Sequence, residues 1–147
     1  MADFSAIPWI ADHIALYRSD PEKAHMWDSS AAGGTGGPLP TLLLTTTGRK
    51  SGAPRALPLI YGNHGESYII IASKGGMPND PIWFLNLEAK PECELMVGAK
   101  AVSARARIVT GDEREEIWAK MAEIYPPYLD YQKRTERQIP VVVLDPI

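Results

Sequence analysis

Residues 41–61 read TLLLTTTGRKSGAPRALPLIY, two β-rich runs joined by a short loop. Pro54 and Pro58 place the second run at a sheet edge or in an irregular stretch, because proline has no amide hydrogen to donate. Periodicity predicts the remaining elements: strands at residues 67–73, 92–97, 100–109 and 138–144, and helices at residues 7–18, 81–90 and around 117–124. Only one connection between strands is long and helical, so we predict a mainly β (α+β) fold, a small antiparallel barrel with added helices.

Local signals mark the connections between these elements. Asn63, His64 and Gly65 predict a hairpin turn. Thr110 with Glu113 matches a capping box at the start of a helix.

The region before the first long strand has a different composition. Ile10, Ile14 and Tyr17 recur at helical spacing and predict a short amphipathic helix, with Trp9 near the same stripe. Residues 29–40 are rich in Ser, Ala, Gly and Pro, which indicates a flexible connection rather than a second domain. We therefore treat residues 1–147 as one domain whose first 40 residues are a helix and a glycine-rich linker.

Composition excludes several classes of protein. The chain has 147 residues, 45% of them apolar and 22% charged, which is typical of one globular domain. Its net charge of −3 argues against nucleic acid as the main partner. A single cysteine, Cys93, excludes a disulfide within the chain and fits a reducing compartment. With no signal-peptide start and no apolar run of about 20 residues, we expect a cytoplasmic protein.

The loop between the first two runs is basic. Arg49, Lys50 and Arg55 lie within seven residues, and residues 29–65 contain no Asp or Glu. A local positive site on an acidic protein indicates a polyanionic ligand, and Gly48 and Gly52 would let such a ligand approach the backbone. The loop is not a P-loop, because it connects two strands. A solvated basic turn is the competing interpretation.

Three further segments are candidates for a site. The first is the end of a predicted strand, which contains Ser73, Lys74, Gly75 and Gly76. A flat ligand could lie against the glycine backbone there. An ordinary turn at the end of a strand is the competing interpretation.

Aromatic residues supply the other two segments. Trp83 on the 81–90 helix is more simply a core residue than a cofactor contact, and Asn86 needs a partner if it is buried. Tyr125, Tyr128 and Tyr131 share one helical face, which could donate hydrogen bonds to an aromatic substrate or form a packing stripe.

Other chemistries find little support. His13, His25 and His64 are scattered without ligand-like spacing, so we expect no metal site. Cys93 alternates with Leu95 and Val97 and is expected to be a core thiol.

The motifs together resemble one family. LLTTTGRKSGxxR, ASKGG, PxWxxNL and YxxYxxY followed by IPVV are similar to segments of the deazaflavin (coenzyme F420)-dependent nitroreductases, in the same order over residues 41–146. The resemblance implies a split β-barrel like that of FMN-binding proteins. It also implies an enzyme that uses reduced F420 as cofactor and transfers a hydride to electron-poor acceptors such as quinones, nitroaromatic compounds and activated C=C bonds.

The resemblance also implies roles for residues. The phosphodiester and glutamate tail of F420 would be bound by Arg49, Lys50, Ser51, Gly52, Arg55 and Lys74. The ring would lie against Ala72, Ser73, Gly75 and Gly76, with Trp83 and Asn86 at its border. The acceptor would meet Ser73, Tyr125, Tyr128 and Tyr131, and one of the tyrosines would assist protonation.

Two alternatives stay open. An FMN-dependent split-barrel oxidoreductase would need fewer cations, because FMN has one phosphate and no glutamate tail. A non-catalytic F420 carrier would need the cations but not the tyrosines. The resemblance also leaves open whether the N-terminal helix covers the site or makes a peripheral membrane contact, and whether two copies pair as a homodimer.

Overall fold

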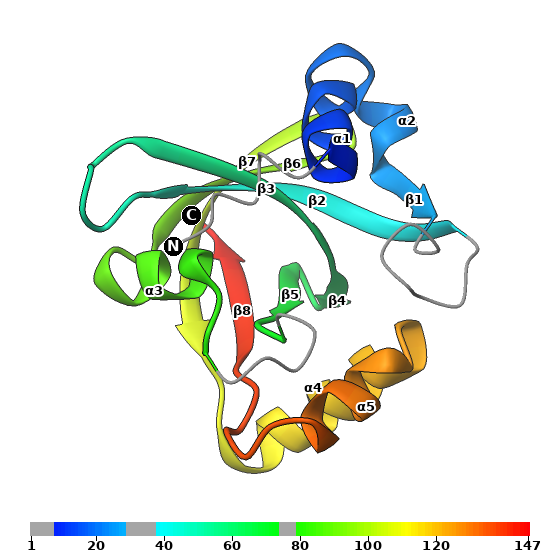
Figure 1. Ribbon diagram of the computed structural model, residues 1–147, viewed down its shortest axis with the longest axis vertical. Coiled ribbons are helices and arrows are strands. Elements are labelled where there is room, and N and C mark those ends of the chain that lie inside the picture. Colours follow the sequence, from blue (N-terminus) through cyan, green and yellow to red (C-terminus); the bar gives the residue numbers. More distant parts are fainter. Residues whose placement is uncertain (1–7, 29–37, 74–78) are drawn as a thin grey trace.

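The computed structural model describes residues 8–28, 38–73 and 79–147. Within these ranges, eight strands form one sheet with antiparallel pairs throughout, which curls on itself (Figure 1). The strands are β1 Met26–Asp28, β2 Pro38–Thr47, β3 Pro54–Ile60, β4 Gly62–His64, β5 Ser67–Ile71, β6 Glu92–Val97, β7 Lys100–Ile108 and β8 Val141–Pro146. The helices are α1 Pro8–Ser19, α2 Pro21–His25, α3 Ile82–Ala89, α4 Gly111–Ile124 and α5 Pro127–Lys133.

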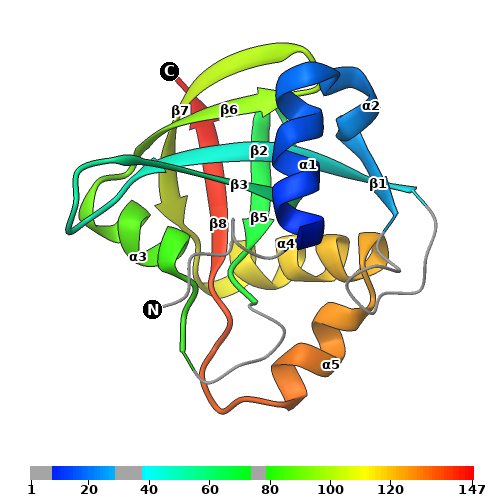
Figure 2. The same cartoon turned by 45° about the horizontal axis from the view of Figure 1, so that its top comes forward.

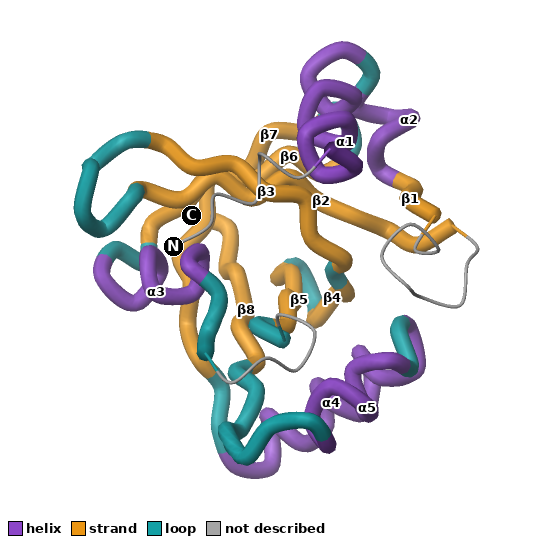
Figure 3. Tube along the Cα trace, viewed as in Figure 1, coloured by secondary structure: helices purple, strands orange, loops and turns teal. Residues whose placement is uncertain are grey.

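The order of strands in the sheet is β1-β2-β6-β7-β8-β5-β4, and β3 pairs only with β2. The predicted edge position of the proline-containing run is therefore confirmed. Helices lie around the curled sheet: α1 and α2 at one side, α3 beside the β2–β3 hairpin, and α4 with α5 at the opposite side (Figures 1 and 3). The predicted antiparallel sheet with added helices is confirmed.

Strand β5 separates two clusters of buried side chains. Ile70 points into one cluster, which also contains Ala72 beyond the strand end together with Trp83 and Phe84 of α3. Ile69 and Ile71 point into the other, which contains the tyrosines of the α5 region. This division follows from the alternation of side chains along a strand. A single strand thus reaches both parts of the molecule to which sequence analysis assigned site residues.

The predicted hairpin after residue 62 is confirmed, but its turn lies later than predicted: Asn63 and His64 belong to β4, and the two-residue turn before Ser67 begins at Gly65, whose φ of 62° suits glycine. The predicted capping box does not form: Thr110 makes no side-chain cap, and the carboxylate of Glu113 accepts a hydrogen bond from Arg107 Nη1 at 3.2 Å. A charged donor competes well against a backbone amide for a carboxylate.

Strand β8 begins three residues later than the predicted position, at Val141. Pro140 precedes it and has no amide hydrogen for pairing with a neighbouring strand. The amide of Ile139 instead donates to Gln132 Oε1 at 2.9 Å. The segment before β8 is therefore bound by the side chain of Gln132 on α5 as well as by the backbone beyond β5, where the amide of Ala72 donates to the carbonyl of Pro140 at 3.0 Å.

Candidate functional site

The basic loop is a tight hairpin between β2 and β3. The amide of Gly48 donates to the carbonyl of Ala53 at 2.8 Å, and the amide of Gly52 donates to Gly48 at 2.8 Å. Gly52 has a φ of 71°, and a Cβ on Gly48 would lie 2.6 Å from Ser51 Oγ. The positive φ of Gly52 is therefore required by the turn, and Gly48 leaves room for the Ser51 hydroxyl. Ser51 also serves the turn, because its Oγ accepts the amide hydrogen of Ala53 at 3.1 Å.

The three cations of this hairpin are exposed and point away from the core. Arg49, Lys50 and Arg55 each have exposed side chains. Among the described residues, no carboxylate forms an ion pair with any of them. The repulsion among the three positive charges is therefore not offset by a carboxylate of the described residues. An anionic ligand at the hairpin would reduce this repulsion and be bound favourably.

Asn86 anchors the hairpin to α3. Its side chain is 1% exposed, its Oδ1 accepts the amide hydrogen of Arg49 at 3.1 Å, and its Nδ2 donates to Thr46 Oγ1 at 3.0 Å. The predicted need for a partner is met, and both ends of the amide are used within the protein. Asn86 therefore positions the basic loop.

Trp83 lies in the core cluster that also contains Ala72. The indole is 6% exposed and packs edge-on against Phe84, with 6.3 Å between ring centroids. The structure thus places two of the residues assigned to the ring side of the cofactor in one cluster. Lys74, Gly75 and Gly76 lie outside the described residues.

The three tyrosines form a compact group at the start of α5. Ring centroids of Tyr125 and Tyr128 are 4.9 Å apart, and those of Tyr128 and Tyr131 are 6.3 Å apart. The hydroxyls of Tyr125 and Tyr131 are in hydrogen-bond contact at 3.1 Å. The predicted shared face is therefore confirmed, and part of it packs against Ile71 and Ile60.

Tyr128 has a buried hydroxyl. The side chain is 5% exposed, and in the described part of the chain its hydroxyl has no hydrogen-bond partner. Burial, and then the neighbouring Tyr125 and Tyr131, raise the pKa of Tyr128 well above its ordinary value. Burial likewise raises the pKa of Tyr125. Both phenols therefore stay protonated at neutral pH and can act only as donors of that proton or as neutral acceptors.

Ser73 is the other residue that the resemblance assigns to the acceptor. It is 9% exposed, and its carbonyl accepts a hydrogen bond from Arg137 Nη2 at 2.8 Å. Arg137 was missed by the sequence analysis, because no local motif marks an arginine whose contacts lie 64 residues earlier in the chain.

The N-terminal helices pack against the barrel, where α1 lies over β2 and β3 (Figure 2). Ile14 and Tyr17 are buried with Leu43, and the Tyr17 hydroxyl donates to the carbonyl of Thr41. The described members of the apolar stripe therefore face the sheet, and they do not support a membrane contact. The side chains of Trp9 and Ile10 lie outside the described residues, and no described helix is long and apolar enough to cross a bilayer.

Known proteins similar to this chain identify its family. A family model described as F420H(2)-dependent quinone reductase matches residues 18–146. The chain belongs to this family. An F420H(2)-dependent quinone reductase of Mycobacterium tuberculosis is 43% identical over 111 residues, 74% of each chain.

Two solved structures are also similar to this member of the quinone reductase family. A structure of an F420-H2 dependent reductase is 42% identical, with a TM-score of 0.67 over 71% of this chain and 93% of that one. A structure described as a domain-swapped dimer has the same identity and TM-score, over 71% of this chain and 79% of that one. The predicted split barrel, the oxidoreductase class and the dependence on reduced F420 are therefore confirmed.

Proposed function

We propose that this F420H(2)-dependent quinone reductase family member binds the anionic tail of F420 at the β2–β3 hairpin and reduces a quinone beside the tyrosines. The observation that carries the proposal is the set of exposed cations on the β2–β3 hairpin, which have no ion-pair partner among the described residues. F420 has a phosphodiester and glutamate carboxylates, so its charge matches this donor set. Arginine binds such oxyanions with two parallel hydrogen bonds, and lysine binds them as a point charge.

Each part of the site has a distinct task in this proposal. Reduced F420, when bound, supplies a hydride from its deazaflavin ring to an electron-poor acceptor. Arg49, Lys50 and Arg55 bind the tail, with Lys74 and the Ser51 hydroxyl as further donors. Asn86 acts on the tail indirectly, because it fixes the backbone at Arg49.

The remaining assigned residues border the ring and the acceptor. Ala72 and Ser73, with the Gly75–Gly76 backbone, would lie against the ring, and Trp83 would close its apolar side. Tyr128 would hold a proton on its hydroxyl and donate a hydrogen bond to a quinone oxygen, which would satisfy a buried group that has no partner in the described ranges. Tyr125 and Tyr131 would orient the same acceptor.

The two alternatives predict different binding. FMN would leave part of the cation set unused, and a carrier of F420 would have no use for a buried, unpaired phenol. Titration of the protein with F420 and with FMN, followed by cofactor fluorescence, distinguishes an F420-dependent enzyme from an FMN-dependent one. We expect tight binding of F420 and weak binding of FMN. Preference for FMN would refute the proposal.

Turnover separates an enzyme from a carrier. A quinone is added under anaerobic conditions to the protein with reduced F420, and the return of oxidised F420 absorbance is monitored. We expect reoxidation at a rate that saturates with quinone. Tight F420 binding without acceleration over the protein-free reaction would favour the carrier.

Two wider assignments belong to the same proposal. We place the protein in the cytoplasm, and we propose that two copies associate, because one similar structure is a domain-swapped dimer. Light scattering at micromolar concentration tests the association, and a mass of 16.1 kDa would show a monomer.

A further inference from the structure

Arg137 lies between the tyrosine region and the end of β5. Its Nη1 donates to the carbonyl of Ala72 at 3.2 Å, and its Nη2 donates to the carbonyl of Ser73 at 2.8 Å. The same Nη1 forms an ion pair with Asp80 Oδ1 at 2.9 Å. One guanidinium therefore holds the successive carbonyls of Ala72 and Ser73 together with the carboxylate of Asp80.

The backbone of Arg137 is in turn fixed by α5. Gln132 Nε2 donates to the carbonyl of Arg137 at 2.8 Å, and Gln132 Oε1 accepts the amide hydrogen of Ile139 at 2.9 Å. Ala72 closes the arrangement, because its amide donates to the carbonyl of Pro140 at 3.0 Å. The chain segment from 137 to 140 thus binds both backbone groups of Ala72 and is itself attached to the helix that carries the tyrosines.

The choice of arginine is specific to this geometry. The planar fork of a guanidinium reaches two neighbouring carbonyls at once, whereas a lysine ammonium offers donors at one point. The side chain of Arg137 is 15% exposed and that of Asp80 is 31% exposed. A partly buried ion pair contributes little net stability by itself, so its value here lies in fixing the position of the backbone.

We propose that Arg137 is a positioning residue that fixes the Ala72–Ser73 backbone against the deazaflavin ring and sets its distance from the tyrosines. The inference rests on the proposed site, since it takes residues 72 and 73 as the ring contact. It predicts that Arg137 strengthens binding of the cofactor ring and has no effect on binding of the anionic tail. Substitution of a residue that only stabilises the fold would lower Tm without raising either dissociation constant of the folded protein.

The test uses Arg137→Lys and Arg137→Gln in the full chain. Dissociation constants are measured for F420 and for its tail-less chromophore, the deazaflavin with its ribityl chain but without phosphodiester or glutamates. Loss of one or two charge-assisted bonds should raise both constants by about tenfold, with the smaller effect in the lysine variant. Asp80→Asn should shift both constants in the same direction and serves as the second variant if Arg137→Gln does not fold.

Arg107→Gln is the matched control. Arg107 is also an arginine that joins separate elements, since its Nε donates to Asp145 Oδ2 at 2.8 Å and its Nη1 to Glu113 Oε1 at 3.2 Å, but no bond joins it to Ala72, Ser73 or the 137–140 segment in the described part of the chain. We expect this variant to lose these ion pairs and to leave both dissociation constants unchanged. Unchanged constants in both Arg137 variants and in Asp80→Asn, or the same shift in Arg107→Gln, would overturn the inference.

The outcomes also separate this inference from the proposed function. If wild-type protein binds neither F420 nor the chromophore, the proposed function fails. If wild type binds both, Lys50→Ala weakens F420 binding, and Arg137→Gln and Asp80→Asn behave as wild type, only the role of Arg137 is refuted.

Discussion

Among single residues of the site, Tyr128 has a buried hydroxyl whose hydrogen-bonding capacity is unused in the described part of the chain. A buried hydroxyl without a partner costs about 1–3 kcal/mol of folding free energy. Tyr128 is 5% exposed, and its hydroxyl has no partner among the described residues. Such a cost persists in an enzyme when a substrate supplies the missing partner.

Removal of this hydroxyl should therefore have opposite effects on stability and on turnover. We expect Tyr128→Phe to keep or raise the Tm of the free protein, because an unsatisfied polar group is lost. Quinone reduction at saturating F420 should fall by about tenfold, equivalent to about 1.4 kcal/mol. Thermal unfolding and steady-state kinetics check the two effects.

Tyr68→Phe is the control for this substitution. Tyr68 also packs against another tyrosine, Tyr61, with 5.6 Å between ring centroids, but it belongs to the other core cluster. We expect unchanged turnover in this variant. Tyr128→Phe with a full rate of quinone reduction would remove the hydroxyl from the site.

Sequence spacing foresaw the tyrosine group because a helix places residues three apart on one face. It did not foresee Arg137, whose partners Ala72 and Ser73 are brought to it only by the pairing of β5 with β8. It also treated Asn86 as a residue beside the ring, whereas both ends of its amide bind Thr46 and Arg49.

At the scale of elements, the hairpin and α3 act as one unit. Asn86→Ala should leave the Arg49 amide and the Thr46 hydroxyl without their partner and lower unfolding free energy by about 1–3 kcal/mol. F420 binding should weaken as well, because the cations are no longer held in place. Urea unfolding and F420 titration measure the two losses.

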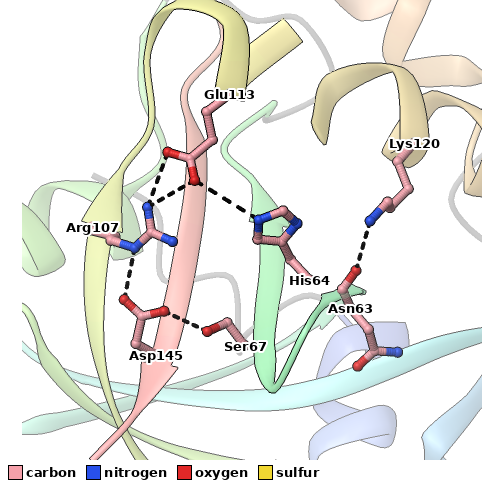
Figure 4. Close-up of polar contacts among 7 residues, drawn as sticks. All are labelled: Asn63, His64, Ser67, Arg107, Glu113, Lys120 and Asp145. Atoms are coloured by element: carbon pink, nitrogen blue, oxygen red, sulfur yellow. Dashed lines mark hydrogen bonds and ion pairs between the residues drawn. The ribbon is translucent and has the colours of Figure 1, made fainter. Parts of the chain in front are cut away.

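Asn63→Ala is a suitable comparison for the element-scale test. Asn63 is exposed on β4, and Lys120 Nζ binds its backbone carbonyl at 3.4 Å rather than its side chain (Figure 4). We expect neither stability nor F420 affinity to change there. Full F420 affinity in Asn86→Ala would show that the anchor has no part in cofactor binding.

Strand positions were predictable because they depend on local patterns of β-branched, aromatic and proline residues. The order of the strands was not, because β2 pairs with β6 and β5 pairs with β8 across long stretches of sequence. The capping box failed for the same reason: Arg107, on a different element, provides the stronger partner for Glu113.

At the scale of the whole molecule, a polar network ties α4 to the sheet away from the site. Arg107 binds both Glu113 of α4 and Asp145 of β8, and Ser67 of β5 donates to the same Asp145 (Figure 4). His64 lies 3.9 Å from Glu113. The hydrogen bond from Ser67, and then Arg107, lower the pKa of Asp145 below its ordinary value of 3.8.

This shift predicts a dependence of stability on pH. A carboxylate with a lowered folded-state pKa contributes stability above its unfolded pKa and loses it as pH falls through the folded value. Asp145→Asn should therefore be less stable than wild type at pH 7, by at most about 1 kcal/mol because the pair is exposed. The difference should shrink as pH falls from about 5 to 3.

Urea unfolding at both ends of this pH range checks the prediction. Glu116→Gln, a charge removal at an exposed position of α4, is the control and should show no such trend. A difference between Asp145→Asn and wild type that is constant with pH would show that the network does not stabilise the ionised carboxylate.

The most direct test of the account is the binding of F420 and of its tail-less chromophore to wild type and to the Lys50→Ala/Arg55→Ala double variant. The Lys100→Ala/Arg105→Ala variant, which removes two exposed cations from β7, controls for net charge. We predict that Lys50→Ala/Arg55→Ala binds F420 at least about tenfold more weakly at low salt, and that the loss shrinks at high salt. The chromophore should bind equally to all three proteins. Equal F420 affinity in Lys50→Ala/Arg55→Ala, or an equal loss for the chromophore, would contradict the claim that the hairpin binds the tail of the cofactor.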